Sequence, residues 1–477
     1  MFRTILILLI FQFTNLYAQP DTLWQRVYDN NDRGETCITG IQTNDGGFML
    51  GGTRYSFENN YNMHVKKVDS QGELEWTSTF VTPSSGAILS LLQHPDNYYY
   101  GTGNFRYRNM GATYGYLLKF DENGDSLWTS LIGGESSSIR CSVLSRDSCI
   151  VVGGKTSEFA RFGGSDAFMA KFDPDGEEIW SSVFGGDGND YIYGMTNTED
   201  GGYALCGETR SFGNGIQFYL VKTDSLGEVE WSNAYGDSLS DLSFAIVQCA
   251  DGGFALAGKS YFWNNGMNSI GSLVRTDDEG NEIWSRHYGT GGFDWFNDLI
   301  CIEDNGFVLA GQIAAFHSAM YIVRTDSQGE ELWAGYYNIT RSIDTCEKVI
   351  RSEDSGFYFI GQASANEGMV LIKTAPDPAS VLCLIDPAFP AQYILHTPYP
   401  NPFNSTTRIA FQLPYPSHVN LSICDQQGRE VTVLLNQNMA PGTHEVRWQA
   451  EDQPSGMYFC MMDADGFRIS RKVAYVR

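Results

Sequence analysis

Tryptophan recurs along the first three quarters of this 477-residue chain at an almost constant interval. Seven tryptophans are separated by 52, 52, 52, 51, 53 and 49 residues: Trp24, Trp76, Trp128, Trp180, Trp231, Trp284 and Trp333. A fixed period of this length indicates repeated units that bury their apolar faces against one another. We therefore predict that each indole fills space between adjacent sheets. Seven equivalent sites argue against a ligand platform.

Two short sequence patterns recur with the same period and mark tight turns. The last six of these tryptophans close the pattern D-x-x-G-x-x-x-W, with Lys or Arg two residues before each Asp. A second pattern places Gly seven residues after Asp, from Asp45/Gly52 to Asp354/Gly361. Asp caps turns and Gly accepts a positive φ, so both patterns indicate turns between strands.

The turns divide each unit into four pieces of strand length. In the fourth unit these are residues 191–198, 202–207, 218–223 and 229–235. A large residue four positions after each Trp shares its face of the strand, because side chains alternate along a strand. Four-stranded units of about 50 residues are typical of β-propeller blades. The sequence predicts an all-β protein.

The ends of the array predict seven blades. The seventh unit has three strands, and residues 375–378 then lack both the Gly turn and the Trp. Residues 21–24 match residues 125–128 of a regular unit, so strand 23–28 is predicted to complete the last blade. An N-terminal strand in this place closes the ring without leaving a sheet edge.

The repeats resemble known propeller families. The segments DGGFALAG (251–258) and YLVKTDSLGEVEW (219–231) are similar to bacterial and archaeal propeller repeats of about 50–60 residues. The D-x-x-G-x-x-x-W segment also resembles the tryptophan-docking motif of quinoprotein propellers. Since a vicinal Cys pair is missing from the sequence and the repeats are longer, we carry over no quinone and expect no cofactor. The segment 173–176 (DPDG) suggests Ca²⁺, but it lacks a full EF-type loop, which favours a turn-capping Asp.

Residues 1–18 have the features of a secretory signal peptide: Arg3, an apolar stretch over 5–13, and Ala18 before the expected cleavage point. No later segment is long and apolar enough to predict a transmembrane span.

Ten Cys are scattered without metal-site spacing, and we assign no disulfide pairs. The chain has 31 basic and 57 acidic residues, a formal net charge of −26, which argues against a nucleic-acid partner.

The C-terminal part differs in composition. Residues 375–392 form a predicted Pro-rich linker, and alternating segments beyond it indicate a small antiparallel β-sandwich over 393–477. Four motifs resemble the type A C-terminal sorting domain of type IX secretion cargo. Their key residues are Pro400, Asn401, Pro402, Phe403, Asn404, Gly428, Gly442, Gly456, Tyr458 and Lys472. The resemblance implies recognition by the type IX machinery and export through the periplasm, to the medium or the outer cell surface.

Motifs of catalysis are lacking: the sequence has no HExxH, GxSxG or Walker loop. Loops after the second and fourth strands carry Arg and aromatic residues that suit sugars or peptides. The candidates are Arg54, Tyr55, Arg106, Arg108, Arg161, Arg210, Tyr261, Trp263 and Trp295. Packing within their own loops is the alternative role.

We expect a non-enzymatic glycan- or protein-binding propeller. The alternatives are a polysaccharide hydrolase or lyase with carboxylates in the funnel, and a structural surface component.

Overall fold

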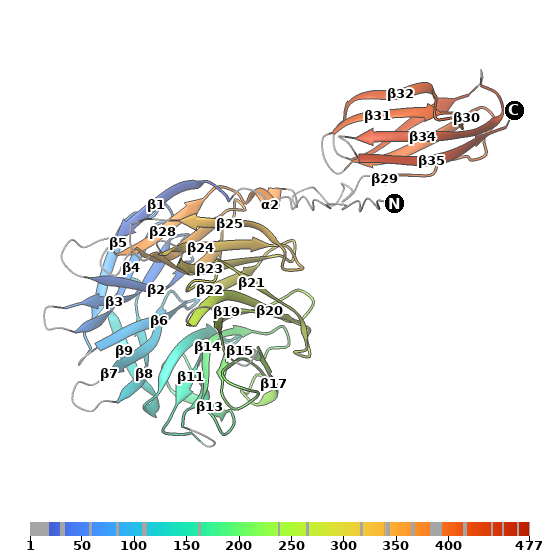
Figure 1. The fold of residues 1–477 in the computed structure, drawn as a ribbon. Coiled ribbons are helices and arrows are strands. Elements are labelled where there is room, and N and C mark those ends of the chain that lie inside the picture. The colour runs from blue at the N-terminus through green and yellow to red at the C-terminus, as the bar shows by residue number, and fades with distance from the viewer. Residues whose placement is uncertain are drawn as a thin grey trace, which may run out of the picture. The chain divides into compact units, whose positions relative to one another are not determined.

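The fold is known from a computed structural model (Figure 1). It describes residues 19–28, 34–56, 60–82, 85–106, 112–160, 164–236, 239–263, 267–314, 318–337, 339, 344–363, 368–381, 394–413, 417–439, 442–450, 453–464 and 467–476. The signal-peptide prediction and most of the predicted linker lie outside these residues. The chain divides into two compact units, Met1–Ser380 and Val381–Arg477, which are described separately.

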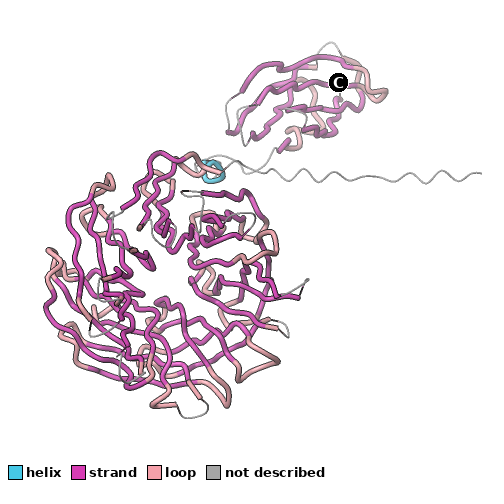
Figure 2. Tube along the Cα trace, turned by 60° about the vertical axis from the view of Figure 1, so that its left-hand side comes forward, coloured by secondary structure: helices cyan, strands magenta, loops and turns pink. Residues whose placement is uncertain are grey.

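The first unit is a propeller of seven four-stranded antiparallel sheets (Figures 1 and 2), as predicted. Blade 1 contains β2 (Glu35–Gln42), β3 (Phe48–Tyr55), β4 (Tyr61–Val68) and β5 (Leu74–Phe80). Blade 2 contains β6 (Ser85–Gln93), β7 (Tyr99–Arg106), β8 (Thr113–Phe120) and β9 (Ser126–Glu135). Blade 3 contains β10 (Ser138–Leu144), β11 (Ile150–Thr156), β12 (Asp166–Phe172) and β13 (Glu178–Phe184). Blade 4 contains β14 (Asp190–Asn197), β15 (Tyr203–Thr209), β16 (Gln217–Thr223) and β17 (Val229–Tyr235).

The remaining three blades follow the same order, except that the last is completed from the N-terminus. Blade 5 contains β18 (Ser240–Gln248), β19 (Phe254–Trp263), β20 (Met267–Thr276) and β21 (Glu282–Tyr288). Blade 6 contains β22 (Trp295–Cys301), β23 (Phe307–Ala314), β24 (Ser318–Thr325) and β25 (Glu331–Tyr337). Blade 7 contains β26 (Asp344–Arg351), β27 (Phe357–Ala363), β28 (Met369–Thr374) and β1 (Thr22–Tyr28). The predicted closure is confirmed, because β1 pairs antiparallel with β28 from Thr22↔Thr374 to Tyr28↔Met369.

The propeller core consists of seven clusters of buried side chains, one at each interface between adjacent blades. Between blades 3 and 4, for example, Ala167 and Phe184 pack with Ile192 and Tyr219. Burial of a large apolar side chain contributes about 1.5–3 kcal/mol, so each interface is a substantial source of stability. The ring therefore holds its innermost strands in fixed positions around the axis.

The repeated tryptophans connect each blade to the next. Trp76 of blade 1 lies against Gly124 in the turn of blade 2, where an added Cβ would come within 2.6 Å of the indole. Gly124 also has φ +83°, so this position favours glycine for two reasons. The other five D-x-x-G glycines receive the tryptophan of the preceding blade in the same way. Six indoles are half-buried at the edge of the interface, and Trp333 is fully buried.

The two repeated sequence patterns meet on one edge of the propeller. In blades 1, 3, 4, 5 and 6 the base of the first pattern pairs with the Asp of the second pattern in the same blade, whereas Lys119 of blade 2 donates to the Pro174 carbonyl. Lys171 Nζ lies 2.8 Å from Asp147, Lys222 Nζ 2.7 Å from Asp200, and an Arg275 nitrogen 2.6 Å from Asp251. In antiparallel strands, turns 1–2 and 3–4 lie at the same edge of the sheet. The connections that carry the predicted ligand residues therefore lie on the opposite edge.

Residues 375–379, which the sequence analysis places in the linker, pack on the propeller. Asp377 is fully buried, Ala379 belongs to the core between blades 6 and 7, and the short helix α2 spans Pro378–Val381. Asp377 lies at the position where the other blades carry the D-x-x-G turn. It accepts hydrogen bonds from Trp333 Nε1 (2.9 Å) and Arg324 Nε (3.1 Å). A buried carboxylate thus takes the place of the missing glycine turn.

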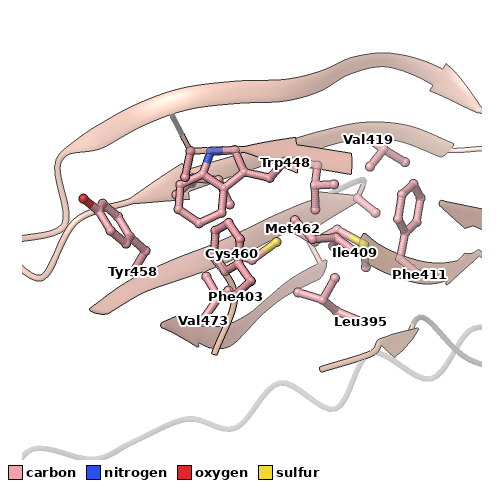
Figure 3. Close-up of a cluster of buried hydrophobic side chains, with 14 of the residues drawn as sticks. Leu395, Phe403, Ile409, Phe411, Val419, Trp448, Tyr458, Cys460, Met462 and Val473 are labelled. Atoms are coloured by element: carbon pink, nitrogen blue, oxygen red, sulfur yellow. The ribbon is translucent and has the colours of Figure 1, made fainter. Parts of the chain in front are cut away.

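The second unit is a two-sheet antiparallel sandwich. One sheet contains β29 (Ile394–Leu395), β30 (Thr406–Leu413) and β33 (Gly442–Gln449). The other contains β32 (Glu430–Met439), β31 (Ser417–Cys424), β34 (Gly456–Ala464) and β35 (Phe467–Tyr475). Its buried core includes Phe403, Trp448, Tyr458 and Val473 (Figure 3).

The sorting-motif residues have structural roles within the sandwich. The Phe403 ring lies 5.1 Å from the rings of both Trp448 and Tyr475. Asn401 binds the last strand twice, donating to the Lys472 carbonyl (3.0 Å) and accepting from the Ala474 amide (2.8 Å). Tyr458 donates to the Pro454 carbonyl at 2.7 Å. The P-N-P-F-N segment therefore anchors the C-terminal strand.

Candidate functional site

A β-bulge in the innermost strand of every blade directs one side chain toward the propeller axis. In all seven blades the pairing of the first and second strands skips one residue. A bulge re-aims the unpaired residue. The seven skipped residues line one cavity of about 230 Å³, the axial channel: Ile38, Leu89, Arg140, Tyr193, Phe244, Asn297 and Glu347.

One side of the axial channel carries three charged groups. Lys348 Nζ lies 3.0 Å from Asp298, and the same carboxylate accepts the Val349 amide at 2.9 Å. Burial raises the pKa of the neighbouring Glu347 from 4.5 to about 8; Asp298 adds to this rise and Lys348 opposes it. The channel thus holds one carboxylate that is neutral below about pH 8 beside one that is ion-paired. When two acids of one site lie in different environments, their pKa values differ, and one can act as a proton donor while the other stays ionised.

The raised pKa of Glu347 predicts a pH-dependent stability. The folded protein keeps a proton on Glu347 that the unfolded chain releases above pH 4.5. The stabilisation that this proton contributes is therefore fully present below pH 4.5 and is lost as the pH rises through about 8. Relative to the Glu347→Gln variant, we expect the wild type to lose about 1–3 kcal/mol between pH 5 and 8.5, because contact with channel water reduces the full effect. Urea unfolding of both proteins across this range measures the difference, and parallel pH profiles would contradict the assignment.

A cluster of cations and aromatic rings lies where the second strands of blades 3, 4 and 5 pass the axial channel. We call it the channel-mouth cluster; it comprises Arg140, Lys155, Tyr191, Tyr193, Glu208, Arg210, Phe244, Lys259, Tyr261 and Trp295. Lys155, Glu208 and Lys259 directly follow the Gly of the second pattern in consecutive blades. The strand positions repeat around the ring, so equivalent residues of neighbouring blades approach one another at this level.

Each cation of the second strands faces aromatic rings. Lys155 Nζ lies 4.0 Å from the Tyr191 ring centroid. Lys259 Nζ lies 5.0 Å from Tyr261 and 5.5 Å from both Phe244 and Trp295. These distances are those of cation–π contacts, which hold the ammonium groups in place.

Among the described residues, Glu208 is the carboxylate that lies between these cations. Burial raises the pKa of Glu208, while Arg210, Lys155, Lys259 and a hydrogen bond with Tyr193 act in the opposite direction. Arg140 adds a further cation 5.8 Å from the Tyr193 ring. Four cations against one carboxylate make this region locally positive in a chain of net charge −26. Such a region attracts anionic groups.

The structure brings together only some of the predicted ligand residues. Tyr261 and Trp295 flank Lys259, and Arg210 lies near Glu208. Arg54 pairs with the buried Glu35 of its own blade at 3.4 Å, and Tyr55 packs edge-on against Tyr61.

The remaining predicted ligand residues divide into two groups. Arg106 lines a separate pocket of about 180 Å³ between blades 1 and 2. Arg108 and Arg161 lie outside the described residues, as does the side chain of Trp263, whose backbone belongs to β19.

The prediction missed most of the channel-mouth cluster because it considered loops rather than strands. Lys155, Glu208 and Lys259 share one position, directly after a repeated Gly, where the other blades have Thr, Asn or Gln. Comparison of the seven repeats position by position would have singled out these three charges. The prediction also missed Tyr191, Tyr193 and Phe244, which lie in other strands and could not be found in this way.

The described residues contain no group of three His, Cys, Asp or Glu side chains arranged for a metal ion. Asp173 Oδ1 instead accepts the amides of Asp175 (3.0 Å) and Glu177 (2.9 Å), which is turn capping. The nine cysteines that lie within the described residues are thiols. In the same part of the chain, no helix has the length and apolar character needed to cross a membrane.

Comparison with known proteins identifies the C-terminal unit. Residues 397–475 match the family model described as a secretion system C-terminal sorting domain. The chain is a seven-bladed β-propeller with a type IX C-terminal sorting domain. That domain directs export by the type IX system, so the protein is secreted or displayed at the cell surface. A search of curated proteins found no match.

Solved structures similar to this chain are propellers of low sequence identity. The Neurospora crassa Pan2 WD40 domain is 10% identical with a TM-score of 0.48, and the match covers 75% of this chain and 96% of that one. Sqt1 from Chaetomium thermophilum is 10% identical with a TM-score of 0.45, covering 75% and 99%. The β-propeller domain of the Trilobed protease from Pyrococcus furiosus is 11% identical with a TM-score of 0.39, covering 73% and 95%.

Proposed function

We propose that this protein is an exported binding protein whose channel-mouth cluster recognises an acidic extracellular glycan. The observation that carries the proposal is the concentration of Arg140, Lys155, Arg210 and Lys259 around one carboxylate, in a chain with 57 acidic and 31 basic residues. A ligand that carries carboxylate or sulfate groups would be drawn to this region by its charge.

The aromatic residues of the cluster supply the second part of the recognition. Tyr261 and Trp295 remain half-buried, so part of each side chain is accessible to solvent. Aromatic rings beside fixed cations suit a sugar ring that bears a carboxylate, because the ring packs against the apolar surface while the charge meets the ammonium. A uronic-acid polymer combines these features in every residue.

The axial channel supports a second candidate function, polysaccharide hydrolysis or elimination. Glu347, with its pKa raised to about 8, and the ion-paired Asp298 form two carboxylates in different environments. A neutral acid beside an ionised carboxylate is the arrangement that glycosidases use for general acid catalysis. The channel-mouth cluster would then hold the polymer that the channel carboxylates cleave.

Calorimetry of polygalacturonate and alginate binding to the full mature chain tests the proposal. Dextran serves as the uncharged control polymer. We expect Lys259→Gln and Trp295→Ala each to weaken binding about tenfold, since each removes one charged or aromatic contact. Arg106→Ala is the matched control, because Arg106 lines a separate pocket. The affinity of this variant for the acidic polymers should remain within about twofold of that of the wild type.

Unchanged binding in both cluster variants would contradict the site. Release of reducing ends or of unsaturated sugars, lost in Glu347→Gln, would favour the second candidate over simple binding.

A further inference from the structure

A cavity of about 490 Å³ lies between blades 4 and 5. Phe218 and Tyr235 form its wall on blade 4, and Ser272, Val274 and His287 form its wall on blade 5. Four of these side chains are buried, and His287 on the outer strand is exposed. The cavity also reaches Tyr261, the one residue that it shares with the channel-mouth cluster.

Comparison of the repeats explains why the cavity exists. The third strand of each blade has an interface position three residues before the repeated Lys or Arg. This position is aromatic in four blades, as Tyr116, Phe168, Tyr219 and Tyr321, but it is Ser272 in blade 5. Phe168, Tyr219 and Tyr321 are each only 2% exposed, because their rings fill the space against the preceding blade. Blade 5 lacks this ring, and the space remains open.

The cavity also retains the polar partner that the internal rings use. Tyr116 shares a hydrogen bond with Thr129, and Tyr219 shares one with Ser232. In blade 1, the ring of His64 at the same position is 3.1 Å from the Thr77 hydroxyl. Each of these hydroxyl residues directly follows the repeated Trp. The equivalent residue of blade 5 is Ser285, which lines the cavity.

The cavity also contains a group that can stack against the face of a bound ring. In blade 6, Tyr321 stacks on Tyr336 of the adjacent strand, with ring centroids 5.5 Å apart. Ser272 pairs in register with His287, the residue equivalent to Tyr336, and its Oγ lies 2.9 Å from His287 Nδ1. An imidazole therefore stands where a stacking partner stands in blade 6.

We infer that the cavity between blades 4 and 5 binds a para-substituted phenol, such as a tyrosyl group, in the position that Tyr219 occupies in blade 4. The ring lies between Phe218 and His287, and its hydroxyl bonds with Ser285. The substituent leaves along Tyr261 and Phe262, which line the cavity near the end of β19. The groups that hold the ring, Phe218, Ser285 and His287, lie outside the channel-mouth cluster, and the cavity shares only Tyr261 with that cluster.

Titration of the full mature chain with 4-methylphenol, followed by ligand-observed NMR, tests the inference. We expect saturable binding that Ser272→Tyr weakens at least about tenfold, because the new side chain supplies the ring from within. Ser272→Ala preserves the cavity and should keep the affinity within about twofold. Ser285→Ala should weaken 4-methylphenol about fivefold and leave toluene unchanged, since only the hydroxyl loses its partner.

Two results would overturn the inference: no saturable binding, or binding that is the same in the wild type, Ser272→Tyr and Ser285→Ala. The Ser285→Ala comparison keeps the test valid even where Ser272→Tyr folds poorly. N-acetyltyrosinamide separates the two sources of such a ring. Competition with 4-methylphenol supports a tyrosyl ligand, and failure to compete supports a small free phenol.

Discussion

Deletion of residues 393–477 is expected to abolish delivery to the cell surface and to leave a folded propeller in the periplasm. The sorting-domain match covers 397–475, and the sandwich has its own buried core. The seven clusters between blades are built from residues up to Ala379 only, so the deletion removes none of them. The deletion should therefore abolish export without lowering the free energy of unfolding of the propeller.

Cell fractionation and protease accessibility of intact cells measure this outcome. Asn401→Ala is an informative partial variant, because it removes the two hydrogen bonds that the Asn401 side chain makes to the last strand without deleting the unit. It should reduce surface delivery in proportion to the loss of folded sandwich. Arg106→Ala in the propeller serves as the control and should be exported normally. Normal display of the truncated chain would refute the role of the C-terminal unit.

Asp377→Ala is expected to destabilise the propeller by about 3–5 kcal/mol. The substitution leaves Arg324, which is fully buried, without one of its two carboxylate partners. It also leaves the buried Trp333 indole N–H without its acceptor. Breaking a buried charge pair by removing one partner costs more than the pair contributes, since the remaining charge stays desolvated.

Urea unfolding at neutral pH measures the effect of Asp377→Ala. The matched control is Asp173→Ala, which removes a turn-capping carboxylate of a regular blade that lies in an exposed turn. We expect that control to lose about 1 kcal/mol or less. Asp377→Asn keeps an acceptor for the indole and should lie between the two. Equal losses in Asp377→Ala and Asp173→Ala would show that the closure of blade 7 does not depend on the buried carboxylate.

The seven-bladed architecture could be predicted because its determinants are local and repeated. Each blade carries its own turn glycines, and the Trp and Gly that join blades recur at a fixed interval, as Trp76 and Gly124 show. The closing strand was predictable for the same reason, since residues 21–24 repeat residues 125–128. Asp377 was assigned to a linker because Ala375–Pro378 breaks the pattern, and its burial depends on Arg324 and Trp333, more than forty residues away.

The sequence alone determined the number of blades, the way the ring closes and the secretory destination, because these depend on periodic spacing and on contiguous motifs. The tertiary structure decided where chemistry is concentrated. Lys259 meets Phe244 and Trp295 only because three strands from two blades converge at the axial channel. The 490 Å³ cavity likewise exists because Ser272 faces the neighbouring blade from a position where four other blades carry an aromatic ring. A linear repeat identifies equivalent positions, but only packing between blades shows which exceptions leave space or gather charge.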